Sequence, residues 1–162
     1  MITLSATACI DAPAQAVWKQ LAELEGISRW APSIRKAHCA GARSRGIGAE
    51  RTCELVGDLT ITERWTAWDE GRSFTYEGSG LPLVKRAMNT WSVRPDGDRS
   101  MLVSEALVEL KGGAFGRMFE PVFAAIFRRM APDSLAAFKY VVEHGKPFNG
   151  PPSRLPRAPV AC

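Results

Sequence analysis

The feature that most constrains the fold is a run of apolar residues at helical spacing near the end of the chain. Starting at Phe115, the run recurs every three or four residues, which is typical of an α-helix with one apolar face. Its members are Phe115, Met118, Phe119, Val122, Phe123, Ile126, Phe127 and Met130. The opposite face carries Arg117, Ala124, Arg128 and Arg129. We interpret that face as solvated, and contact of its arginines with anionic lipid or a partner is the alternative.

The same helix is predicted to continue past a proline as far as His144. Pro132 lacks an N–H group and its ring clashes with the preceding turn. After it the stripe resumes, displaced by about one residue as in a kinked helix, at Leu135, Phe138 and Val142. At about 1.5 Å per residue, such a helix is on the order of 45 Å long. A helix of that length needs a broad apolar surface to pack against.

The preceding part of the chain predicts such a surface in the form of a sheet. Residues Ile2–Ile10 alternate loosely and form the first expected strand. Asp11 is the predicted N-cap of a helix that has Pro13 in its first turn and ends at Gly26, and a short helical turn follows. Six further strands, joined by tight turns and therefore mostly antiparallel, are expected at about 34–40, 49–56, 59–68, 72–77, 85–94 and 100–111. The predicted class is α+β.

Alternation along the strands predicts which side chains face the long helix. The inward sets are Arg51, Cys53 and Leu55; Leu59, Ile61, Glu63, Trp65 and Ala67; Phe74 and Tyr76; Ala87, Asn89, Trp91 and Val93; and Leu102, Ser104, Ala106, Val108 and Leu110. The small members of these sets leave room beneath a wide helix. The polar members Arg51, Glu63 and Asn89 need partners if they are buried.

Charge, cysteine content and hydropathy exclude several classes of function. The net charge is +4, but the last eighteen residues contribute three of these charges, so we expect no nucleic-acid partner. The four cysteines and two histidines lack metal-ligand spacing, and we expect free thiols in the cytoplasm, no metal and no cofactor. No apolar run approaches the ~20 residues that a membrane-spanning helix needs, so we expect no integral membrane contact.

Several segments carry a family resemblance: Ala12–Trp18, Ile27–Pro32, Gly48–Arg51, Glu63–Asp69, Trp91–Asp98, Gly113–Arg117 and Ser134–Lys139. Together they resemble the START-like helix-grip superfamily (SRPBCC), in particular its bacterial polyketide cyclase/dehydrase and lipid-transport group. The resemblance implies one domain over residues 1–144, with a seven-stranded curved antiparallel sheet wrapped around the long C-terminal helix and two short helices after the first strand. Pro121 and Pro132 depart from the pattern, as does the proline-rich tail 145–162, which we expect to lack regular structure.

The resemblance also implies a deep cavity between helix and sheet, and this leaves two main hypotheses for function. One is binding of a hydrophobic or polycyclic small molecule or a lipid, by a monomer or homodimer. The other is an enzyme of the polyketide cyclase/dehydratase type, with Glu63 as general acid/base beside Arg51. A regulatory or interaction module is a third interpretation. The expected ligand-binding residues are Trp30, Cys53, Glu63, Trp65, Tyr76, Asn89, Trp91, Ser104, Ala106, Phe115, Met118, Phe119, Val122, Phe123 and Ile126.

Four of these residues have a competing structural interpretation, and for Trp65 and Trp91 it is a place in the aromatic core. Glu63 is also explained by an inward salt bridge with Arg51, or by a hydrogen bond with Asn89 or Tyr76. Trp30 fits either the core or the mouth of the cavity. The alternatives differ in what each side chain contacts, which the fold decides.

Overall fold

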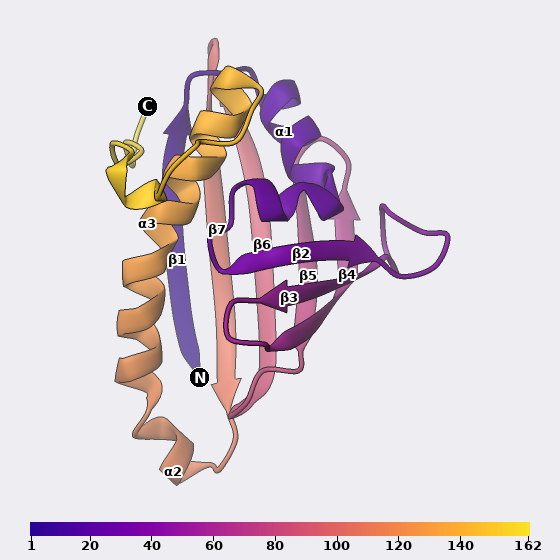
Figure 1. Ribbon diagram of the computed structural model, residues 1–162, viewed down its shortest axis with the longest axis vertical. Helices are drawn as coiled ribbons and strands as arrows, with labels where there is room; N and C mark the ends of the chain where they lie inside the picture. The colour runs from indigo at the N-terminus through magenta and orange to yellow at the C-terminus, as the bar shows by residue number, and fades with distance from the viewer.

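The computed structural model describes residues 1–162 and confirms the α+β architecture with one seven-stranded antiparallel sheet (Figure 1). The sheet has the order β1-β7-β6-β5-β4-β3-β2. Its strands are β1 (Ile2–Ile10), β2 (Ile34–Cys39), β3 (Glu50–Leu55), β4 (Thr60–Asp69), β5 (Ser73–Ser79), β6 (Val84–Asp96) and β7 (Arg99–Leu110). The helices are α1 (Ala14–Ala22), α2 (Ala114–Arg117) and α3 (Glu120–His144), with 3₁₀ turns η1 (Leu24–Arg29) and η2 (Pro152–Arg154). None of the helices is long and apolar enough to cross a membrane.

The long helix α3 packs mainly on β1, which is an edge strand of the sheet, and bends near its middle (Figure 1). Pro132 lies at this point inside the helix, where it removes one backbone donor. Beyond the bend α3 is buried through Leu135, Ala136, Ala137, Phe138 and Val141. The helix ends at His144, and the next residue, Gly145, caps it: its left-handed backbone (φ 71°) lets its N–H donate to the carbonyl of Val141.

The burial pattern of the sheet agrees with the predicted inward faces, with a local exception in β4. A bulge between Trp65 and Ala67 shifts the alternation, so Ala67 is exposed and Trp68 turns inward instead. The Trp68 ring packs on Phe74 with ring centroids 5.3 Å apart. Leu59, which precedes β4, is also exposed. The inward prediction is therefore wrong for Leu59 and Ala67, because strict alternation holds only where the ladder is regular.

The first helix differs from the prediction at both ends. Asp11 does not cap it, since Pro13 occupies the N-cap position without a side-chain hydrogen bond. Asp11 instead forms an ion pair with Lys139 of α3, at 2.8 Å. The helix ends at Ala22 rather than at Gly26, which lies inside η1. A tertiary contact therefore replaces the local cap.

The long C-terminal helix is also shorter than predicted, because the helix is interrupted at residues 118–119, between α2 and α3. Gly116 in α2 is buried against the carbonyl of Lys111, where an added Cβ would clash. The predicted apolar face is rotated, since Ala124, predicted to be solvated, is buried in a small cluster with Ile2 and Leu4. The alanine side chain is small enough for the helix to approach β1 closely. The displaced residues Phe115, Met118, Phe119, Val122, Ile126 and Met130 are exposed.

The prediction of four free thiols is wrong, because Cys9 and Cys162 form a disulfide that leaves only Cys39 and Cys53 free. The tail returns to β1, where the backbone N–H of Cys9 donates to the carbonyl of Pro159 at 2.6 Å. Apart from η2, the tail has no helix or strand. The pairing is invisible to spacing arguments since the two cysteines lie 153 residues apart.

Replacing Cys162 with serine should destabilise the protein, because the disulfide closes a very long loop in the unfolded chain. We expect Cys162→Ser to lower the free energy of unfolding by about 2–4 kcal/mol, measured by denaturant titration without reductant. Cys39→Ser, at a free and half-buried cysteine, is the matched control. Equal stability of Cys162→Ser and the oxidised parent protein would contradict the stabilising role.

Candidate functional site

A cavity of about 350 Å³ lies between the concave face of the sheet and the first half of α3. Of the 25 residues that line it, 19 are hydrophobic, so it favours an apolar occupant. It lies between the two apolar clusters of the core, since it is bordered by Trp91 and Leu135 of the larger cluster and by Leu4 and Ala106 of the smaller one.

One wall of the cavity is aromatic. Trp30, at the C-terminal end of η1, is buried and borders the cavity. Its ring meets Trp91 and Phe138 edge-on, with ring centroids 5.7 Å and 5.0 Å apart. Trp30 therefore belongs both to the core and to the cavity lining, and the two alternatives for it are compatible. These contacts fix the position of the ring before any ligand enters.

The sheet contributes a chain of hydrogen bonds across three neighbouring strands. Ser104 Oγ of β7 donates to Asn89 Oδ1 of β6 at 3.1 Å, and Asn89 Nδ2 donates to the hydroxyl of Tyr76 in β5 at 3.2 Å. All three residues border the cavity. Because the Tyr76 oxygen accepts in this chain and no protein acceptor takes its proton, the hydroxyl is free to donate to a ligand. Burial, together with the negative charge of Glu63, raises the pKa of Tyr76, so the phenol keeps that proton.

Beside this chain lies a buried ion pair between Arg51 of β3 and Glu63 of β4, which are register partners. Arg51 Nε and Nη2 donate to Glu63 Oε2 at 2.8 Å and 2.5 Å, and Nη1 donates to the carbonyl of Leu24 at 2.5 Å. Burial on its own lowers the pKa of Arg51, but the Glu63 carboxylate, together with Tyr76 and Cys53, outweighs it and the pKa is raised. Arg51 therefore stays charged. Of the alternatives for Glu63, the structure contains the inward salt bridge with Arg51.

Only one oxygen of Glu63 is used within the protein. Oε2 accepts both arginine donors and lies 3.5 Å from the thiol of Cys53, whereas Oε1 accepts no hydrogen bond. Since Glu63 borders the cavity, Oε1 is a free acceptor at its wall. Burial, aided by Glu63, raises the pKa of Cys53 to about 12, so this thiol stays protonated and is a poor nucleophile.

The structure brings most of the residues predicted to bind ligand to the cavity. Those that border it are Trp30, Glu63, Tyr76, Asn89, Trp91, Ser104, Ala106, Phe123 and Ile126. Cys53 and Trp65 are instead enclosed in the core behind the cavity wall, and Arg51 stacks over Trp65 there, 5.0 Å from its ring centre. Phe115, Met118, Phe119 and Val122 lie away from it on the exposed side of α2 and α3.

Sequence reasoning missed part of the lining. Leu4, Ala6 and Ala87 border the cavity and could have been predicted, because they lie on the inward-facing positions of β1 and β6. Phe127 and Met130 also border the cavity, and their helical spacing in the apolar run could have indicated them. Other contributors, such as Ser33 and Ser134, have no pattern of their own and depend on how the elements pack.

The sheet, the long helix and the cavity between them define a helix-grip protein, and comparison with solved structures agrees. A protein from Thermobifida fusca is 25% identical, with a TM-score of 0.68 over 89% of this chain and 97% of that one. The ZhuI aromatase/cyclase from Streptomyces sp. R1128 is 21% identical, with a TM-score of 0.72 over 88% and 93% of the chains. Norcoclaurine synthase from Thalictrum flavum, in complex with dopamine and hydroxybenzaldehyde, is 20% identical, with a TM-score of 0.66 over 88% and 87%.

The chain belongs to the polyketide cyclase/dehydrase and lipid transport family, whose model matches residues 1–143. The resemblance inferred from the sequence motifs is thereby confirmed. No curated protein sequence matches the chain. The family joins cyclases and dehydrases with proteins that transport lipids, and so places the chain among proteins that act on or bind hydrophobic molecules.

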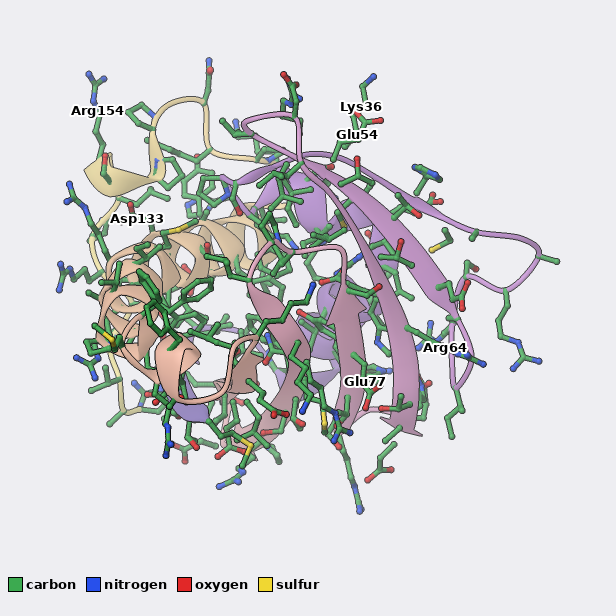
Figure 2. All side chains as sticks on the ribbon, turned by 90° about the horizontal axis from the view of Figure 1, so that it is seen from below. Lys36, Glu54, Arg64, Glu77, Asp133 and Arg154 are labelled. Carbon is green, nitrogen blue, oxygen red and sulfur yellow. A yellow bond between two sulfur atoms is a disulfide. The ribbon has the colours of Figure 1, made fainter.

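Removing one partner of the buried ion pair should destabilise the fold strongly. Glu63→Ala leaves the guanidinium of Arg51, which is 3% exposed, without a counter-ion, and we expect a loss of about 3–5 kcal/mol in the free energy of unfolding. Glu77→Ala is the matched control, because Glu77 pairs with Arg86 at 2.6 Å on the outer face of the sheet (Figure 2).

That exposed pair should contribute only roughly 0–1 kcal/mol. Denaturant titration of both variants measures the difference. Comparable losses for Glu63→Ala and Glu77→Ala would show that the buried pair is not an organising contact.

Proposed function

We propose that the protein binds a hydrophobic small molecule, polycyclic or lipid-like, in the cavity between the sheet and α3. The observation that carries the proposal is the composition of the cavity wall, which is mostly apolar but has a free donor at Tyr76 and a free acceptor at Glu63. A volume of about 350 Å³ is in the range typical of small-molecule sites.

The polar groups favour a ligand that carries a hydroxyl group. Tyr76 and Glu63 lie on adjacent strands and on the same face of the sheet. A hydroxyl oxygen would accept from Tyr76, while its proton would be donated to Glu63 Oε1. The remainder of such a ligand would contact Trp30 and Trp91, and the flexible side chain of Met130 would adapt to its outline.

The most direct test looks for the ligand itself. Native mass spectrometry of the purified protein should detect a bound small molecule that is released when the protein is denatured. A titration with an apolar fluorescent dye measures occupancy of the same cavity. Absence of any bound molecule, combined with absence of saturable dye binding, would contradict the proposal.

Filling the cavity should weaken ligand binding without unfolding the protein. Ala106→Phe places a ring into the cavity from β7, so we expect dye affinity to fall about tenfold or more while the melting temperature changes little. Leu107→Phe is the matched control, since the neighbouring residue faces the opposite side of the sheet and is 38% exposed. A large loss of stability in Ala106→Phe with unchanged dye affinity would mean that the region is packed core.

A second candidate function is that of an enzyme in which Glu63 transfers a proton. The free Oε1 at the cavity wall favours it, as does the likeness to the ZhuI aromatase/cyclase and to norcoclaurine synthase. The ion pair argues against it, because protonation of Glu63 would leave the buried Arg51 without its counter-ion. We therefore favour an anchoring role for Glu63.

Glu63→Gln separates the two functions. It keeps the shape and the acceptor oxygen of the side chain, so a binding protein should retain ligand affinity within roughly tenfold. An enzyme should lose turnover by about 10²–10⁴-fold while binding persists. Because the variant also weakens the pair with Arg51, affinity is measured below its melting temperature. A substrate that the parent protein converts, and that Glu63→Gln binds without converting, would establish the enzyme.

A further inference from the structure

The lower end of the molecule carries an apolar surface that the proposed function leaves unused. We call it the apolar patch, and it consists of the exposed side chains Leu83, Phe115, Met118, Phe119, Val122, Ile126 and Met130. Their exposed fractions run from 43% at Met130 to 73% at Phe115. Large apolar side chains scattered singly over a surface need no explanation, but a contiguous group marks an interaction site.

The two parts of the patch, the loop that holds Leu83 and the helical segment, are joined through the backbone. The backbone N–H of Lys111, just before α2, donates to the carbonyl of Leu83 in the β5–β6 loop at 2.8 Å. Figure 2, seen from below, shows this loop beside α2. From Phe119 to Met130 the remaining members recur at helical spacing along one side of α3. The patch also reaches the cavity, because Ile126 and Met130 both border it.

The charges around the patch are mostly positive, although Asp133 lies one helical turn beyond Met130 and forms no ion pair. Lys111, Arg117, Arg128 and Arg129 form no ion pair in the structure. The only acidic residue between Lys111 and Pro132 is Glu120, and the amino group of Met1 neutralises it at 2.8 Å. An apolar helix face bordered by unpaired cations is typical of segments that lie in the interface of a membrane.

We propose that the apolar patch docks on the surface of an anionic phospholipid bilayer. The apolar side chains would enter the acyl boundary while Lys111, Arg117 and Arg129 contact lipid phosphates. Arg128 takes no part, because it lies on the side of α3 that faces the tail. A second copy of the chain fits less well, because self-association through this face would bring like charges together. Docking would turn the side of the cavity bordered by Ile126 and Met130 toward the lipid, so an apolar ligand could pass between the two without crossing water.

The test uses co-sedimentation with vesicles of phosphatidylcholine, alone or mixed with phosphatidylglycerol. The parent protein should bind the mixed vesicles, with affinity falling as salt rises, because exposed charges are screened beyond about 8 Å at physiological ionic strength. Phe115→Glu and Met118→Glu should each weaken binding about tenfold or more. Neither residue borders the cavity and both are exposed, so dye binding and the circular-dichroism melt should stay unchanged.

Ile47→Glu is the matched control, because Ile47 is 57% exposed in the β2–β3 loop, which projects on the side of the molecule away from α2 (Figure 1). It should bind vesicles as the parent does. Arg117→Ala combined with Arg129→Ala should weaken binding to mixed vesicles by roughly fivefold per charge, with a smaller salt dependence.

Results of two kinds, from the vesicle assay and from light scattering, would overturn the docking proposal. One is failure of the parent protein to bind mixed vesicles at low salt, or binding that Phe115→Glu leaves unchanged. The other is a dimer in light scattering that Phe115→Glu dissociates, which would assign the patch to a second copy. The vesicle assay needs no ligand in the cavity, so its failure would leave the proposed function intact, as unchanged dye binding would show.

Discussion

The arrangement of the molecule depends on how the second half of α3 packs into the core. Phe138 is fully buried, meets Trp30 edge-on and lies in the same cluster as Leu135 and Val141. The first half of the helix has a much narrower contact with the sheet, in which Ala124 lies against the residues of β1. Because one half is fixed in the core and the other rests on an edge strand, space remains between α3 and the centre of the sheet. The cavity occupies that space.

The Arg51–Glu63 pair provides a second constraint at the opposite wall. A buried ion pair contributes little net stability compared with apolar side chains of similar size, so its value lies in positioning. Arg51 joins β3 and β4 to the carbonyl of Leu24 in η1, and η1 leads directly to Trp30. The same contact turns Oε2 of Glu63 toward the guanidinium and leaves Oε1 unused. One interaction therefore sets both the aromatic and the polar side of the cavity.

The sequence was sufficient for the order of elements and for most of the inward faces, because alternation in a strand is a local property. It found Glu63, Tyr76, Asn89 and Ser104 for that reason. The sequence prediction was wrong where tertiary contacts determine the structure, as for the orientation of the helix and the pairing of the cysteines. Apolar residues cover more than half of the circumference of the helix between Phe115 and Met130, so periodicity alone could not tell which of them face the sheet. The disulfide depends on the path of the tail, which no local pattern encodes.

The cavity and the apolar patch have a common physical cause. Once Phe123, Ala124 and Phe127 take the contact with β1 and its neighbours, the exposed apolar residues of this half-helix have no strand to cover them. Exposed apolar area costs about 25 cal/mol per Å² relative to burial. Charged residues in the patch would remove this cost without disturbing the core, since Phe115 and Met118 contact solvent rather than the sheet. That these positions are nevertheless apolar, beside cations without partners, is explained if the surface is covered by lipid when the cavity exchanges its ligand.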